Sequence, residues 1–270
     1  MTDFLQLLVG GMATGAIYGL AALCFTLLWQ ASGTINFAQG EFVMLPAFAM
    51  LGFIAAGAPL ALSFLLTCAV AVAVLGWAFK RGIADPLLRF GMMPIVVATI
   101  GLAIAMRNGV RAGYSAEAHP FPSLFADKLF NVAGVALTLA DVGTLAIALV
   151  LVFATQAFLQ KTVTGRAMQA VAQNTDSATV LGIDVPRMVF YTFAINAVLA
   201  CAAALLVTPT YLAKFDMGEP LGTKAFFAAI IGGFNNSRGA LLGVLIVGVS
   251  ENVAAAYISP AYKDAVALVV

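Results

Sequence analysis

Charged residues are scarce in this sequence. Only 9% of its 270 residues are Asp, Glu, Lys or Arg, whereas 63% are hydrophobic and the mean hydropathy is +1.03. A soluble domain carries about 25% charged residues, so this chain has too few polar groups to cover a surface in water. At roughly 20 apolar residues per membrane crossing, there is room for about eight or nine spans. We therefore expect an all-α, polytopic transmembrane helical bundle with no separate soluble domain.

Residues that carry enzymatic chemistry are equally scarce. His119 is the single histidine, so a metal cluster or a His-based proton relay has almost no ligands to use. Cys24, Cys68 and Cys201 lie far apart in apolar stretches, without metal-ligand or redox spacing. The sequence contains no Gly-rich phosphate loop that ends in Gly-Lys-Ser or Gly-Lys-Thr. We predict that the chain is not an enzyme, holds no cofactor or metal, and has no nucleic-acid partner, since its net charge is only +1.

Apolar runs separated by polar, Gly or Pro residues predict the transmembrane helices. The candidate spans are 4–30, 42–56, 60–79, 93–110, 139–159, 188–212 and 240–257, with a last span that begins near 262 and is incomplete at 270. Residues 221–234 are too few for an ordinary span and predict a half-helix. Residues 32–40 predict a chain break. Such segments are tolerated at membrane depth only beside protein or a cavity.

The positions of Lys and Arg predict the orientation of the chain in the membrane. With the N-terminus outside, seven basic residues fall on the cytoplasmic side and six on the other. Six of the seven lie in two loops, 80–91 and 161–187. We therefore expect a single transmembrane domain, 1–270, whose loop 161–187 is cytoplasmic and whose loop 113–138 is periplasmic.

Glycines spaced four residues apart predict a close helix contact, because they let another backbone approach. Gly11, Gly15 and Gly19 form one such repeat, and Gly239 and Gly243 form a shorter one. A gating or subunit interface is one interpretation. Ordinary packing within the chain is favoured, since this spacing is common in membrane bundles.

The polar segment 161–187 has the periodicity of two short helices. Small apolar residues recur at helical spacing, and residues 174–176 interrupt them. Thr175 or Asp176 can cap the second helix, Gly182 can end it, and Asp184 can cap the next span. An interfacial helix would favour large apolar residues and a basic face, so docking into a groove of another protein is the preferred interpretation.

Several motifs of the chain resemble those of LivH-type permeases, the membrane subunits of branched-chain amino acid ABC importers. In the segment 161–187 these are TGRAMQA at 164–170 and ATVLGI at 178–183. The others are LAAL at 20–23, INFAQGEFVML at 35–45, KAFFAAIIGG at 224–233, GALLG at 239–243, Glu251 and YISPAYKD at 257–264. The motifs occur in the family's order and cover almost the whole chain. Gln39 departs from the pattern, because many members have His there, which excludes a titrating role at this position.

The resemblance implies an ATPase-coupling function for the segment 161–187. The coupling residues would be Thr164, Gly165, Arg166, Ala167, Ala170, Ala178, Leu181 and Gly182. Gly165→Trp or Arg166→Glu should abolish transport and ATPase co-purification while leaving folding intact. The implied partners are a second, LivM-type permease, two cytoplasmic ATPase subunits that bind the ATP, and a periplasmic substrate-binding protein. The implied location is the bacterial inner membrane.

Polar side chains at membrane depth are the candidates for the translocation path, because each needs a partner or a purpose there. They are Asn36, Gln39, Glu41, Asn108 and Glu251. The first three could line the path or satisfy backbone groups freed by the chain break. Glu251 could face the path or form an interhelical hydrogen bond. Asn108, with its neighbours Arg107 and Arg111, could meet a substrate carboxylate or a docking protein. Snorkelling of the arginines to the interface is the plainer account.

Together these observations predict one permease subunit of an ATP-driven ABC importer. It would form half of a path for branched-chain or other hydrophobic amino acids. Urea, short amides or aromatic carboxylates are alternative cargoes within the same family. An ion-coupled secondary transporter and a passive solute channel are alternatives of another class, but neither needs a cytoplasmic docking segment.

Overall fold

The computed structural model describes residues 2–33, 35–88, 90–125, 129–132, 135–233 and 237–257. The elements in chain order are α1 Thr2–Ser32, α2 Gln39–Ala55, α3 Leu60–Ala71, η1 Val72–Ala78, η2 Lys80–Ala84, α4 Asp85–Leu88, α5 Met92–Tyr114, β1 Leu129–Val132, β2 Val135–Thr138, α6 Leu139–Lys161, α7 Val163–Gln173, α8 Thr175–Val180, α9 Val185–Tyr211, α10 Gly218–Gly232 and α11 Ser237–Tyr257. The predicted last span, from 262, lies outside the described residues.

Five of the described helices are long and apolar enough to cross a membrane: Leu7–Gln30, Leu60–Leu87, Met92–Tyr114, Leu139–Lys161 and Val185–Tyr211. Gln39–Ala55 and Gly243–Tyr257 are shorter apolar helices. Large apolar side chains point outward from these spans, among them Leu65, Val97 and Val150, each more than 60% exposed. Such a surface suits lipid or another membrane subunit, so the predicted polytopic helical bundle is confirmed.

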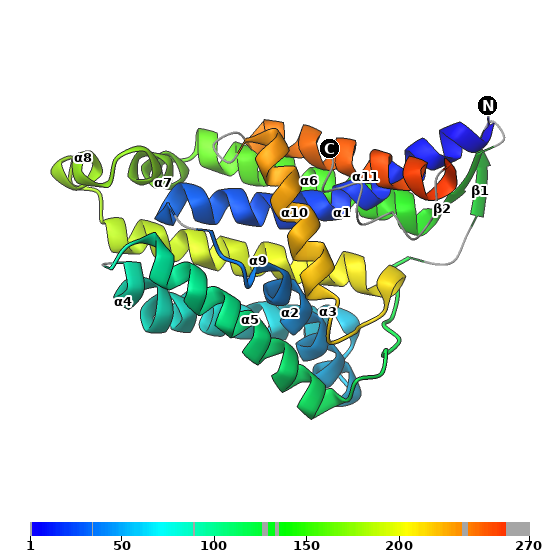
Figure 1. Ribbon diagram of the computed structural model, residues 1–270, viewed down its shortest axis with the longest axis horizontal. Coiled ribbons are helices and arrows are strands. Elements are labelled where there is room, and N and C mark those ends of the chain that lie inside the picture. The colour runs from blue at the N-terminus through cyan, green and yellow to red at the C-terminus, as the bar shows by residue number, and fades with distance from the viewer. Residues whose placement is uncertain are drawn as a thin grey trace.

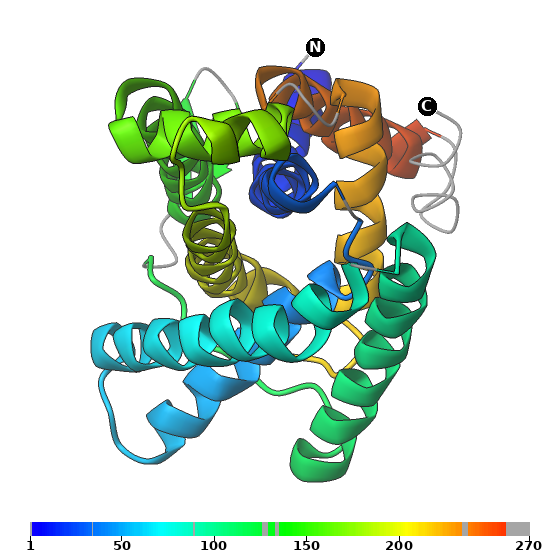
Figure 2. The same ribbon diagram turned by 90° about the vertical axis from the view of Figure 1, so that its left-hand side faces the viewer.

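Helix α1 is the centre of the bundle. It packs against α6, α9, α10 and α11, and its residues from Leu20 to Cys24 are buried. Figure 2 shows α1 end-on between these neighbours. A Cβ atom on Gly11 would lie 2.8 Å from Cα of Val249, and one on Gly15 would lie 2.7 Å from the carbonyl oxygen of Val244. The glycine repeat therefore packs α1 against α11 within the chain, as the favoured interpretation predicted.

Helix α10 differs in direction from the long helices. It runs crosswise to α1 and α9 in Figure 1 and connects the α11 side of the bundle with α2. Its 15 residues are too few for an ordinary span, which agrees with the half-helix predicted for 221–234.

The two ends of the molecule carry its polar connections (Figure 1). At one end, α7 and α8 form a short helical pair. At the other, β1 and β2 form an antiparallel hairpin in which Leu129 pairs with Thr138 and Val132 with Val135. This hairpin was not predicted, because four-residue strands give a weak periodic signal. His119 and Ala213 exchange two backbone hydrogen bonds of 2.9 and 3.0 Å, which join the α5–β1 and α9–α10 connections.

Candidate functional site

Hydrogen bonds to Asn36 and to Thr99 of α5 stabilise the chain break between α1 and α2. Gly33, with φ of +61°, follows the end of α1. The buried Asn36 accepts a hydrogen bond from the backbone N–H of Ala38 at 3.0 Å, and the N–H of Phe37 donates to Oγ1 of Thr99 at 3.2 Å. Asn36 therefore satisfies backbone freed by the break, which was one of its two proposed roles.

Gln39 lies in the interior at the start of α2. Its Oε1 accepts a hydrogen bond of 3.1 Å from Nδ2 of Asn196 on α9, and both side chains are almost completely buried. Asn196 was not singled out in the sequence, although a single Asn within the apolar run 188–212 is the type of residue that joins membrane helices. The pair connects α2 to α9 and lines neither of the two hollows described below.

Glu41 belongs to an ionic cluster that three helices assemble. Nη2 of Arg107, from α5, lies 3.0 Å from Oε1 of Glu41, and Nη1 lies 2.6 Å from Oε2 of Glu219. Glu41 and Glu219 stand in the first turns of α2 and α10, where the helix dipole favours a carboxylate. The Glu41 side chain is 3% exposed and that of Glu219 is 61% exposed. One guanidinium thus holds a buried and an accessible carboxylate.

The structure distinguishes between the two interpretations given for this part of α5. Arg107 does not snorkel to the interface, because its guanidinium is paired with two carboxylates inside a groove. Asn108 is exposed, and its Nδ2 donates to the carbonyl of Ile104 one turn earlier at 2.9 Å. Successive helix residues point about 100° apart, so Arg107, which the sequence interpretation named beside Asn108, is the one that lines the groove.

The Arg107 cluster lies in a groove of about 490 Å³ between α2, α5 and α10. Apart from the charged residues and Thr223, its lining is apolar or glycine: Phe25, Phe37, Gly40, Ile100, Ala103, Ile104, Gly218, Gly222, Phe226 and Phe227. Gly40, Gly218 and Gly222 are present because the backbones of α2 and α10 touch. A Cβ on Gly218 would lie 2.8 Å from the carbonyl carbon of Gly40. The groove is therefore apolar along its length and ionic at Arg107.

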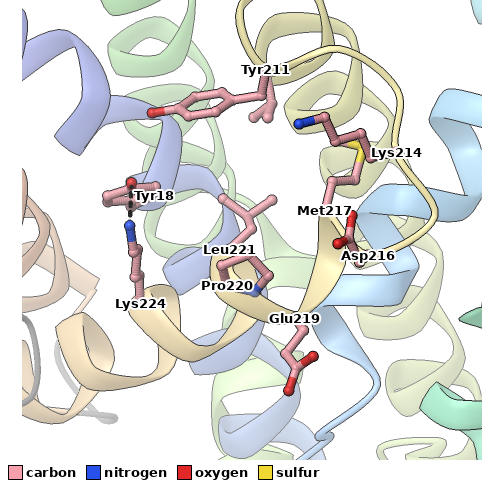
Figure 3. A pocket seen from close by; sticks show the side chains of 10 residues that line it. Tyr18, Tyr211, Lys214, Asp216, Met217, Glu219, Pro220, Leu221 and Lys224 are labelled. Atoms are coloured by element: carbon pink, nitrogen blue, oxygen red, sulfur yellow. Dashed lines mark hydrogen bonds between the residues drawn. The ribbon is translucent and has the colours of Figure 1, made fainter. Parts of the chain in front are cut away.

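A second hollow of about 310 Å³ lies on the other face of α10. Its lining is more polar and includes Tyr18, Tyr211, Lys214, Asp216 and Lys224. Figure 3 shows Tyr18 and Lys224 joined by a hydrogen bond on one side of this hollow and Lys214 and Asp216 on another. Glu219 borders this hollow as well as the groove, and its carboxylate points away from Tyr18 and Lys224 (Figure 3).

Glu251 lies behind the second hollow and is completely buried. Its Oε1 is 3.0 Å from Nζ of Lys224, its Oε2 accepts from the hydroxyl of Tyr18 at 3.1 Å, and Lys224 also donates to that hydroxyl at 3.2 Å. The network joins α11, α10 and α1, as the interhelical interpretation of Glu251 requires. Glu251 would reach the path only indirectly, through Lys224 and Tyr18.

The segment 161–187 folds into the two predicted short helices, but one cap differs. Asn174, not Thr175 or Asp176, caps α8, because its Oδ1 accepts from the N–H of Ser177 at 2.8 Å. Gly182, with φ of +79°, follows the end of α8, and Asp184 caps α9 by accepting from the N–H of Arg187 at 3.1 Å.

The coupling residues predicted in this segment differ in their exposure. Gly165 and Ala178 are buried against the rest of the chain, and Thr164, Ala167 and Ala170 are half-buried. Arg166, Leu181 and Gly182 are exposed, Leu181 at 76%, and so is Val180 at 87%. A Cβ on Gly165 would lie 2.5 Å from Cα of Leu159. Contrary to the prediction, Gly165→Trp should therefore disturb folding, and the exposed group is the most accessible to a partner.

Long apolar helices, a chain break between α1 and α2 and a partly ionic groove define a multi-pass membrane protein and suit one of the permease class. Residues 7–270 match the family described as "branched-chain amino acid transport system / permease component", and the chain belongs to this family. It is 30% identical to the high-affinity branched-chain amino acid transport system permease protein LivH of Salmonella typhimurium strain LT2 over 276 residues, which cover 97% of this chain and 90% of the relative.

Two further relatives give the same picture. LivH of Escherichia coli strain K12 is 30% identical over 278 residues, with 97% of this chain and 90% of the relative covered. The permease protein BraD of Pseudomonas aeruginosa is 29% identical over 280 residues, with 98% and 90% covered. No solved structure matches the chain significantly.

Proposed function

We propose that this chain is one of two permease subunits in an ATP-driven importer of hydrophobic amino acids. The observation that carries the proposal is the helical pair α7–α8, which projects from one end of a membrane bundle and presents Arg166, Val180 and Leu181 outward. Exposed apolar side chains on a capped helical pair outside the spans suit a groove in a partner protein. Two ATPase subunits are the proposed partners at this end.

Hydrogen bonds attach the helical pair to the bundle. Thr162 is the single extended residue between α6 and α7, and its hydroxyl accepts from the N–H of Gly165 at 2.9 Å and donates to the carbonyl of Phe158 at 2.7 Å, so it holds the ends of both helices together. Met168 and Val171 are buried, and α7 also packs on α1 and α9. Closure of the ATPases would therefore move α6, α9 and the centre of the bundle together, which could switch access to the path.

The remaining partners follow from the family. A LivM-type permease would complete the path from the open side of the groove, and a periplasmic binding protein would deliver the amino acid in the bacterial inner membrane. The relatives are branched-chain amino acid permeases by name, which supports cargo of the same kind here. An apolar groove with one ionic position suits an aliphatic amino acid better than urea.

The proposal is tested by charge reversal on the exposed face of the helical pair. Arg166→Glu and Leu181→Glu should each lower co-purification of the ATPase subunits and ATP-dependent leucine uptake at least about tenfold, because an unpaired charge at a docking contact is costly. Glu117→Arg, an exposed charge reversal near the other end, is the control and should leave co-purification of the ATPase subunits unchanged. Normal ATPase recovery in both variants would contradict the docking assignment. Leucine uptake without ATP would favour an ion-coupled carrier.

A further inference from the structure

Helix α10 separates the two hollows. Met217, Pro220, Leu221 and Lys224 line the 310 Å³ hollow, whereas Gly222, Thr223, Phe226 and Phe227 line the 490 Å³ groove. Residues three or four apart share a face of a helix, so these are two different faces of α10. Glu219, in the first turn of α10, borders both spaces. Glu219 is therefore a residue that the two hollows share.

The two hollows lie at different depths along α1. Tyr18 borders the first and Phe25 borders the second. Seven residues of helix correspond to roughly 10 Å, and the direction from Tyr18 to Phe25 along α1 leads from the hairpin end toward the α7–α8 end. The two hollows therefore follow one another along the proposed direction of transport. The ion pair between Arg107 and Glu219 lies beside the boundary between them.

The ionic cluster of Glu41, Arg107 and Glu219 has polar atoms that make no hydrogen bond within the cluster. Nε of Arg107 is buried and has no hydrogen-bond partner among the described residues, and the Glu219 side chain is 61% exposed while it contacts Nη1. Glu41, by contrast, is buried, and it contacts Nη2 of Arg107 independently of Glu219. One guanidinium and two carboxylates give the cluster a formal net charge of −1, since +1 − 2 = −1.

We infer that Arg107 and Glu219 form a transit site for the charged end of an α-amino acid whose side chain is aliphatic. The substrate ammonium contacts Glu219, its carboxylate contacts Arg107, and its side chain lies against Phe37, Ile104 and Phe226 in the groove. The inference rests on the proposed function and adds the residues that contact the substrate. Glu219 is then a specificity-determining residue of the path.

Charge and shape distinguish this ligand from the other cargoes that the sequence left open. An aromatic carboxylate brings a second negative charge to a cluster that already carries −1 and offers Glu219 no donor. Urea and short amides have no apolar part for the groove and no charge for either partner. A zwitterion replaces the ion pair by two equivalent contacts, so Arg107 and Glu219 separate without leaving an unpaired charge.

The test is photo-crosslinking with a leucine analogue that carries a diazirine in its side chain, at millimolar concentration. The complex of permeases and ATPases is used with the binding protein left out, so that its selectivity does not intervene. Label on peptides of α5 and α10 is measured by mass spectrometry. Glu219→Gln should lower it about tenfold, as expected for loss of one charged hydrogen bond, and Glu219→Asp should restore part of it. Glu117→Gln, outside both hollows, is the matched control.

Competition completes the test. Excess leucine should remove the label, whereas 4-methylpentanoate, which is leucine without the amino group, and urea should not. Label that is unaffected by Glu219→Gln, or removed equally by 4-methylpentanoate, would overturn the transit site. ATP-dependent leucine uptake by the wild-type complex with its binding protein is scored separately. Absence of uptake with normal Glu219-dependent label contradicts the import function and not the site.

Discussion

Ionised side chains at the centre of the bundle are held by partners on other helices. Glu41 of α2 pairs with Arg107 of α5, and Glu251 of α11 pairs with Lys224 of α10. Removing one partner from a buried pair is costly, because the other charge stays behind without water. These residues therefore contribute to helix assembly whatever else they do in transport.

The Glu251 network gives a prediction at this scale. Lys224→Met should destabilise the protein by about 3–5 kcal/mol, since it leaves a buried carboxylate unpaired. The double variant Lys224→Met/Glu251→Gln should recover a clear part of that loss. Stability is measured in detergent by the thermal midpoint at which a thiol-reactive dye reaches Cys24 and Cys201, which are buried in the folded protein. Equal losses in the single and double variants would contradict the ion pair.

At the scale of helices, the crossing of α2 and α10 determines the site. Both helices begin there, and their glycines bring Glu41 and Glu219 within reach of one arginine. The contact is backbone to backbone, so neither helix has a side chain that could move aside. A methyl group at this crossing therefore affects the helix packing and the ionic cluster together.

Gly218→Ala tests the crossing. Its Cβ would lie 2.8 Å from the carbonyl group of Gly40 and 2.9 Å from the N–H nitrogen of Glu41. We expect a loss of about 1–3 kcal/mol from overpacking, with reduced leucine uptake as Glu41 and Glu219 move relative to Arg107. Gly101→Ala on α5 is the matched control, because a Cβ there meets nothing within 4 Å. A thermal midpoint unchanged by Gly218→Ala, or equally lowered by Gly101→Ala, would argue against the close crossing.

At the scale of the whole molecule, the polar connections are sorted to opposite ends of the bundle. The exposed Ser177 lies in α8 at one end, and the exposed Ser123 lies in the connection after α5 toward the other. If the α7–α8 end faces the cytoplasm, the two positions lie on opposite sides of the membrane. The orientation itself is still a prediction from the placement of basic residues.

Cysteine labelling tests this orientation. Ser123→Cys should react with a membrane-impermeant maleimide in intact cells, whereas Ser177→Cys should react only after permeabilisation. The half-buried Cys68 is replaced by alanine to lower the background, while Cys24 and Cys201 are already buried. Labelling of Ser177→Cys from outside would reverse the orientation and remove the ATPase assignment of α7–α8.

Composition and periodicity determined the class of this protein and most of its elements. An apolar chain with 9% charged residues has to form helices in lipid. The spans, the half-helix and the two short helices of 161–187 follow from local patterns, and so does the cap at Asp184. The motifs along the chain were sufficient to identify the family, because they occur in the family's order and cover almost the whole chain.

Only the tertiary structure decided which residues share a site. The sequence named Asn108 with its neighbours Arg107 and Arg111, but only the rotation of α5 shows that Arg107 is the one that lines the groove. Glu219 was not singled out, since a glutamate at a helix start is ordinary until Arg107 lies beside it. Gly165 and Ala178 seemed available for docking, yet the folded α7–α8 pair packs them inward. Local patterns describe one segment at a time, whereas a charge cluster or a buried face depends on how distant helices cross.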